Sequence, residues 1–150
     1  MIEVKDSYSS ISKDDIGRLE SDLSIKISDQ YSAFLLQHNG GRIVPDGVKV
    51  DGEHFDFVGH LYAIRNELAY DDLLTKIDEL KGMILGHYLP FGESPGGDVF
   101  CLSLSSEEFG AVYHWDHEEA NYDGDPWEYN MTKVASSFND FLEGLYDCDE

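Results

Sequence analysis

The chain has 150 residues, of which 41% are hydrophobic and 13% aromatic. This composition supports one buried core and argues against wholesale disorder, so a single domain over residues 1–150 is predicted. The 31 Asp and Glu residues outnumber the 10 Lys and Arg residues, which gives a formal net charge of −21. Such a charge disfavours binding to nucleic acid or to an anionic membrane and favours a basic protein partner, unless it serves solubility alone.

Two helices are predicted first along the chain. Ser12 suits the N-cap of a helix whose apolar stripe is Ile16, Leu19 and Leu23. Ser28 is expected to start the second helix, whose apolar face consists of Tyr31, Phe34, Leu35 and His38. The run Asn39-Gly40-Gly41 predicts the end of that helix, because Asn and Gly tolerate the left-handed conformation found there.

Residues 42–58 are predicted to form short strands and turns, with a hairpin at Asp51-Gly52. A third helix is expected between Glu67 and Leu80, and a strand at residues 83–85. Residues 89–92 and 94–97 are interpreted as one loop because they contain Pro and Gly.

Strands at residues 98–104 and 111–117 are predicted to pair antiparallel across a turn, and residues 121–126 form a polar loop. A closing helix is expected with Thr132 as its cap and an apolar stripe of Val134, Phe138, Phe141, Leu142 and Leu145. The predicted class is therefore α+β, with a central, mostly antiparallel sheet flanked by N-terminal helices and a C-terminal helix.

The two cysteines do not indicate a disulfide framework. Cys101 lies in an apolar run and is expected to be a buried thiol, whereas Cys148 lies in the acidic tail. The sequence MIEVKDSYSS lacks the apolar core of a signal peptide, and no run is long enough for a transmembrane helix. A cytoplasmic location is predicted.

The segment HWDHEEANYDGDPWEYN, residues 114–130, contains two histidines, six carboxylates and two tryptophans. It lies within a longer stretch, residues 82–132, that has ten acidic residues and no Lys or Arg. Carboxylates without nearby counter-ions repel one another and cost stability, so this stretch is expected to serve a function.

A metal site is not expected in this segment. If residues 111–117 form a strand, His114 and His117 point to opposite faces, which leaves too few ligands on either face. The run Asp123-Gly124-Asp125 resembles part of a calcium loop, but the twelfth position from Asp123 is Val134 rather than Glu. A polar turn is the simpler interpretation, and no cofactor is predicted.

The sequence does not indicate catalysis. No Gly-x-Ser-x-Gly motif is present, and the loop at residues 92–97 has no lysine to bind a phosphate. The chain is therefore predicted not to be an enzyme. An enzyme that uses the His, Asp and Glu side chains of the acidic segment stays as an alternative.

Aromatic residues among the carboxylates favour a protein-binding surface, because aromatic side chains supply the buried anchors of interfaces. Trp115 and Trp127 are the anchor candidates, although either could instead belong to the core. Asp98 could instead cap the Gly96-Gly97 turn, and His117 could be a hydrogen-bonded histidine at a strand end.

Four segments, in this order, resemble the SUKH superfamily, which includes the Smi/Knr-type regulators of fungal cell-wall assembly and many bacterial immunity proteins. They are IGRLESDLSIKISDQYSAFLLQHNGG (16–41), YLPFGESPGGDVFCLSL (88–104), AVYHWDHE (111–118) and VASSFNDFLEGL (134–145). One departure is Ile27-Ser28, where the family often has a proline before the second helix; serine can cap that helix instead.

The resemblance implies an α+β domain without catalytic activity. It also implies an immunity protein, or antitoxin, that neutralises a cognate toxin by direct binding, the toxins of the family often being nucleases or nucleic-acid deaminases. The acidic residues of this chain favour a nuclease, whose basic cleft they could occupy. The alternative is a non-enzymatic scaffold or regulator of the Smi/Knr type. A monomer is expected in the absence of the partner. The predicted partner-binding residues are Asp98, Trp115, Asp116, His117, Glu118, Glu119, Asp123, Asp125 and Trp127.

Overall fold

The computed structural model describes residues 2–148 and contains the predicted mixture of helices and antiparallel strands. The helices are α1 (Lys13–Leu23), α2 (Asp29–Gln37), α3 (Leu73–Leu80) and α4 (Phe138–Gly144). Ser12 and Ser28 cap α1 and α2 as predicted, since each serine side chain accepts a hydrogen bond from a backbone N–H in the first turn. The predicted α+β class is confirmed.

Three antiparallel sheets are present among the described residues. The central sheet has the order β5 (His60–Leu61), β6 (Tyr88–Glu93), β7 (Val99–Ser103), β8 (Val112–Trp115) and β9 (Met131–Ala135). The two smaller sheets pair β1 (Glu3–Lys5) with β2 (Arg42–Val44), and β3 (Gly47–Val50) with β4 (Glu53–Phe57). The β3–β4 turn at Asp51-Gly52 is the predicted hairpin.

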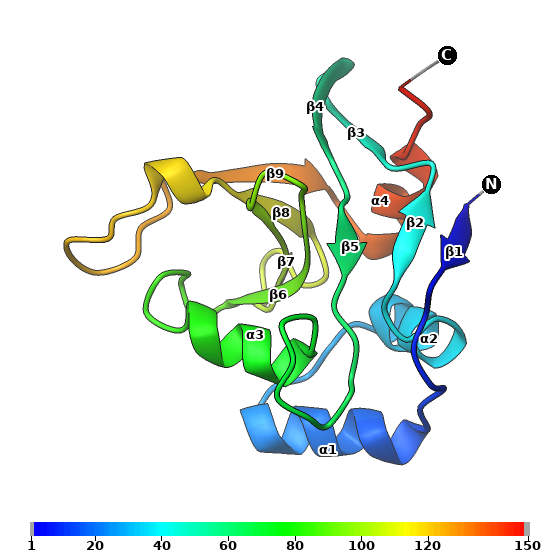
Figure 1. The fold of residues 1–150 in the computed structure, drawn as a ribbon. Coiled ribbons are helices and arrows are strands. Elements are labelled where there is room, and N and C mark those ends of the chain that lie inside the picture. Colours follow the sequence, from blue (N-terminus) through cyan, green and yellow to red (C-terminus); the bar gives the residue numbers. More distant parts are fainter. Residues whose placement is uncertain (1, 149–150) are drawn as a thin grey trace.

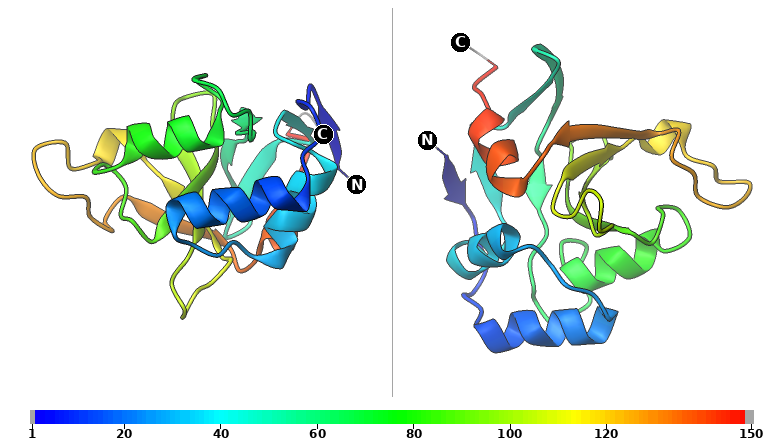
Figure 2. Two further views of the ribbon diagram at one scale, coloured as in Figure 1. Left: turned by 90° about the horizontal axis from the view of Figure 1, so that it is seen from below. Right: turned by 180° about the vertical axis from the view of Figure 1, so that it is seen from behind.

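The arrangement of these elements leaves one connection standing out from the body of the molecule. A short 3-10 helix, η1 (His117–Glu119), follows β8, and the chain then loops outward before it enters β9. Figures 1 and 2 show this loop, coloured yellow to orange, on the side opposite to β1 and the chain ends. We call residues 116–130 the acidic arm.

The central sheet packs on both faces because its inner strands alternate between two apolar clusters. Phe100 and Val112 belong to the larger cluster, together with apolar residues of α1, α2 and α4. Val99, Cys101 and Trp115 point the other way and pack with Ile84 and Tyr88 in a smaller cluster. This alternation places the side chain of His114 on the same face as Val112.

Several predicted elements were wrong. Residues 83–85 do not form a strand, and residues 89–92, interpreted as loop, lie in β6; Pro90 and Gly92 flank an irregularity in its pairing with β7. Residues 67–72 are not helical, since Asp72 caps α3. The closing helix is shorter than predicted: Thr132 lies in β9, and Ser137 is the cap. The strand β1 was not predicted.

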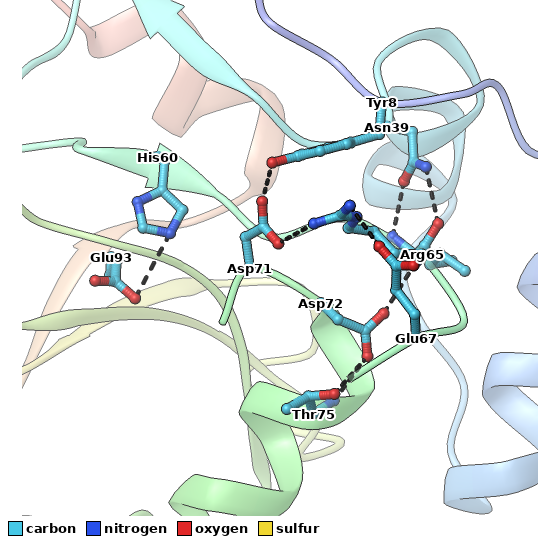
Figure 3. A network of polar contacts seen from close by, with 10 residues as sticks. Tyr8, Asn39, His60, Arg65, Glu67, Asp71, Asp72, Thr75 and Glu93 are labelled. Atoms are coloured by element: carbon cyan, nitrogen blue, oxygen red, sulfur yellow. Dashed lines mark hydrogen bonds and ion pairs between the residues drawn. The ribbon is translucent and has the colours of Figure 1, made fainter. Parts of the chain in front are cut away.

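Asn39 joins three separate parts of the chain at the end of α2. Its side-chain NH₂ donates to the backbone oxygens of Ser9 and Ile64, both at 2.9 Å, and its Oδ1 accepts from the Ile64 N–H at 2.8 Å. Figure 3 shows Asn39 beside a polar network in which Arg65 bonds to Asp71. Next to Asn39, Gly40 has a φ of 73°, and a Cβ there would lie 2.6 Å from the Ala63 Cβ. Only glycine fits this close approach without displacing its neighbour.

Replacing Asn39 with Ala should lower the free energy of unfolding by about 2–4 kcal/mol, because it leaves the buried backbone N–H and C=O of Ile64 without their partner and also removes the partly buried bond to the Ser9 oxygen. Urea unfolding followed by circular dichroism measures this loss. Asn121→Ala is the matched control, since half-buried Asn121 donates one solvent-exposed hydrogen bond to the Asp125 oxygen, and it should cost less than about 1 kcal/mol. Equal losses in the two variants would contradict the role given to Asn39.

His60 and Glu93 lie opposite each other on β5 and β6, with 3.7 Å between His60 Nε2 and Glu93 Oε1. The same carboxylate accepts a hydrogen bond from Tyr62 at 2.9 Å and lies 3.6 Å from the Lys76 ammonium. Burial lowers the pKa of His60; Glu93 opposes this shift and Lys76 adds to it, so the net shift is downward. The folded protein therefore favours neutral His60.

Because the pKa of His60 is lower in the folded than in the unfolded chain, the stability that this residue contributes is present above about pH 6.5 and is lost as the pH falls. His60→Gln removes this dependence. As the pH is lowered from 7.5 to 5.5, the free energy of unfolding of the wild type should therefore fall by more than that of the variant. Urea unfolding at each pH measures both values. A difference that stays constant over this range would contradict neutral His60.

Candidate functional site

The acidic arm is braced by hydrogen bonds within itself. Asp116 caps η1 by accepting from the Glu118 N–H at 2.9 Å, and its backbone oxygen accepts from Asn130 at 2.9 Å, which ties the two ends of the arm together. Further along, Tyr122 donates to the His117 oxygen at 2.8 Å, and Trp127 Nε1 donates to the Glu119 oxygen at 3.1 Å. These contacts use neutral donors, so they define the course of the arm without neutralising its carboxylates.

Five carboxylates of the arm face solvent and form no salt bridge with a Lys or Arg among the described residues. Glu118, Glu119, Asp123, Asp125 and Glu128 are exposed. Within residues 2–148, no salt bridge joins a Lys or Arg to any of them. Glu128 Oε1 lies 3.1 Å from His87 Nε2, and Glu128 Oε2 accepts a hydrogen bond from the Tyr88 hydroxyl at 2.7 Å. The arm therefore presents a concentrated negative charge that a basic partner can neutralise.

Three aromatic side chains lie among these charges. Tyr129 is 90% exposed, Tyr122 60% and Trp127 39%. The Trp127 and Tyr129 rings meet edge to face, with centroids 5.4 Å apart. Large rings held on an exposed loop lose little conformational entropy on binding, so they are suited to anchor a partner.

At the base of the arm, both histidines of the segment contact Asp98. His114 Nε2 lies 3.3 Å from Asp98 Oδ2, and His117 Nδ1 lies 2.5 Å from Asp98 Oδ1. The prediction that these histidines point in opposite directions was therefore wrong. The strand ends at Trp115 rather than at residue 117, so the alternation of side chains stops and η1 turns His117 back over Gly97. Asp98 also accepts from the His117 backbone N–H at 3.0 Å.

Asp56 completes this cluster and was missed by the sequence analysis. It lies on β4, outside the central sheet, and its Oδ2 is 2.8 Å from His114 Nε2. In the sequence, Asp56 is recognisable only as a carboxylate between Phe55 and Phe57. This pattern does not reveal its contact with His114, which lies 58 residues further along the chain. The cluster joins the β3–β4 hairpin, the loop before β7 and the base of the arm.

Charge interactions shift the ionisation of two members of the cluster. The hydrogen bond to Asp98 raises the pKa of His117 above its ordinary value, against a smaller opposing effect of desolvation. Burial acts to raise the pKa of Asp56, but hydrogen bonds from His114 and from the Phe57 N–H outweigh it, so this pKa is lowered. Both shifts favour charged side chains at the base of the arm.

Comparison with known families identifies the fold. A model of the SMI1 / KNR4 family (SUKH-1) matches residues 10–144, which include every helix and the whole central sheet. The chain belongs to the SMI1 / KNR4 family. A search of curated proteins found no match. No helix within residues 2–148 is both long and apolar enough to cross a membrane.

In this SMI1 / KNR4 family member, the predicted partner-binding residues fall into three groups. Glu118, Glu119, Asp123, Asp125 and Trp127 lie exposed on the acidic arm. Asp98, Asp116 and His117 are partly buried at its base. Trp115 is only 3% exposed and packs in the smaller cluster with Cys101, so it is a core residue and cannot offer its ring to a partner in this conformation.

The two tryptophans should report this difference directly. Acrylamide quenches exposed indole rings, so Trp115→Phe, which leaves only Trp127, should be quenched several-fold more strongly than Trp127→Phe, which leaves only Trp115. Both variants should be quenched equally in concentrated urea, where the rings are solvated. Equal quenching of the two native proteins would contradict the placement of the rings.

Proposed function

We propose that this protein is an immunity protein that binds a cognate toxin and blocks it through the acidic arm. Membership of the SMI1 / KNR4 family supports a binding role of this kind. The observation that carries the proposal is the arm itself, where exposed carboxylates that form no salt bridge with a described Lys or Arg lie among exposed aromatic rings.

The chemistry of the arm favours a nuclease as the toxin. A nuclease binds a polyanion, so its cleft must present Lys and Arg side chains at the spacing of phosphates. A row of carboxylates can occupy such a cleft and replace the phosphates, while Trp127, Tyr122 and Tyr129 supply apolar contact. In this proposal the arm competes with the nucleic-acid substrate and takes no part in catalysis.

Electrostatic attraction should also control how fast the complex forms. The whole chain carries a formal charge of −21, and residues 82–132 contain no positive Lys or Arg. Complementary fields raise association rates, and salt screens them. The proposal therefore requires an association rate that falls as the salt concentration rises.

Co-purification with the C-terminal domain of a toxin encoded beside this chain tests the proposal. The arm variant Glu118→Lys, Glu119→Lys and Asp123→Lys changes exposed residues whose side chains make no hydrogen bond or salt bridge found among residues 2–148. It should lose the complex, associate at least about tenfold more slowly at low salt, and fail to inhibit the nuclease.

The matched control makes the same change in charge away from the arm. Asp22→Lys, Glu53→Lys and Glu143→Lys alter exposed residues on α1, β4 and α4. This control should keep most of the association rate and full inhibition. Equal effects of the two variants would show that binding depends on the net charge of the chain rather than on the arm. If the wild type forms no complex, a Smi/Knr-type regulator would be favoured instead.

A further inference from the structure

The contacts around His114 pose a problem of charge at the base of the acidic arm. Its Nε2 faces two carboxylate oxygens, Asp56 Oδ2 at 2.8 Å and Asp98 Oδ2 at 3.3 Å. A ring nitrogen carries at most one N–H, so it can make a well-aligned hydrogen bond to only one of these oxygens or share its proton weakly between both. A cation placed among the three groups would bind both carboxylate oxygens and the ring nitrogen at the same time.

We infer that Asp56, Asp98 and His114 form a binding site for a divalent transition-metal ion of the zinc class. These residues come from β4, from the position before β7 and from β8, and each offers one ligand atom that lies within 4.8 Å of the other two. An imidazole nitrogen and carboxylate oxygens are ligands that zinc accepts, and three protein ligands leave one position of a tetrahedral site open.

The separations fit this ion with a small adjustment. Ligands about 2.1 Å from a tetrahedral zinc lie about 3.4 Å from each other. The distance from His114 Nε2 to Asp98 Oδ2, 3.3 Å, already matches this value. Asp56 Oδ2, at 2.8 Å, must move outward by about 0.6 Å, which a small rotation of the carboxylate on the separate β3–β4 hairpin achieves.

The remaining atoms of both carboxylates are already held in place. Asp98 Oδ1 accepts from the ring and the backbone N–H of His117, and Asp56 Oδ1 accepts from the Phe57 N–H at 2.7 Å. These bonds leave the two Oδ2 atoms turned toward His114. Outer hydrogen bonds that orient ligands in this way are a regular feature of metal sites.

The surroundings favour a cation that keeps some access to solvent. The His114 side chain is 5% exposed and lies between the rings of Phe55 and Phe100, whereas Asp56 and Asp98 are about 20% exposed. The apolar rings pack against the imidazole, and the two carboxylates are more accessible to solvent than the imidazole is. No Lys or Arg among the described residues forms a salt bridge with Asp56 or Asp98 and so competes with the ion.

Calorimetric titration of the chelator-treated 150-residue chain with Zn²⁺ tests the inference. Wild type should bind one equivalent and gain thermal stability in proportion to the free metal. Asp56→Asn keeps the size of the side chain and should lower the affinity at least about tenfold. With Co²⁺ as the probe, wild type should show the intense visible absorption of a tetrahedral site, and Asp56→Asn should lose it.

Two further variants keep the result interpretable. His114→Gln should lose the metal while its circular dichroism spectrum stays native. Asp123→Asn with Asp125→Asn removes two exposed carboxylates from the arm and should bind like wild type.

Absence of binding in the wild type would overturn the inference. So would weak binding of several equivalents that Asp56→Asn does not change, because it would show adventitious binding to surface carboxylates. Loss on His117→Gln but not on Asp56→Asn would also overturn it, since the ion would then sit on the neighbouring set of Asp98, Asp116 and His117.

Discussion

The geometry of the arm depends on how one carboxylate is shared. Asp98 stands at the entrance to β7, and its two oxygens reach His114 on β8 and His117 at the first turn of the arm. This arrangement fixes the point at which the sheet stops and the projecting loop begins. It also links the acidic arm to the β3–β4 hairpin, because Asp56 on β4 contacts the same His114 ring that Asp98 contacts. The position of the exposed face is thus set by residues that are themselves partly buried.

A second constraint comes from the charge of the chain. Ten carboxylates lie in residues 82–132, which contain no Lys or Arg; among the described residues only Glu93 and Glu108 form salt bridges with lysines, Lys76 and Lys133 from outside this stretch. The arm itself relies on other contacts: backbone hydrogen bonds, the Asp116 cap, and hydroxyl or indole donors to backbone oxygens. Surface salt bridges contribute little to the stability of most proteins, so having few of them costs this region little stability. The carboxylates of the arm keep a negative charge that a basic partner can neutralise.

The sequence predicted the elements whose signals are local and missed those that depend on distant contacts. Ser12 and Ser28 identified the starts of α1 and α2, since a cap acts within one turn of its helix. In contrast, Pro90 and Gly92 suggested a loop, but pairing with β7 and burial in the core make this segment a strand. Val134 lies four residues before Phe138, a spacing found along one face of a helix, and yet it belongs to β9. Residues four apart also lie on the same face of a strand, so this spacing alone does not distinguish a helix from a strand. The acidic face was predictable from composition, whereas the meeting of Asp56, Asp98 and His114 was not, since Asp56 arrives from another sheet.

The position of β9 has a consequence for how copies of this protein behave toward each other. This strand is the last in the central sheet, so one side of its backbone has no neighbouring strand within the described residues. Unpaired edges of this kind are where sheets of two molecules can join and aggregation can begin. Here the strand has five residues with an exposed lysine in the middle, and it starts directly after the arm. Edge-to-edge pairing would bring two strongly anionic chains into contact, so the charge that attracts a basic partner also protects the open edge from a second copy of the same chain.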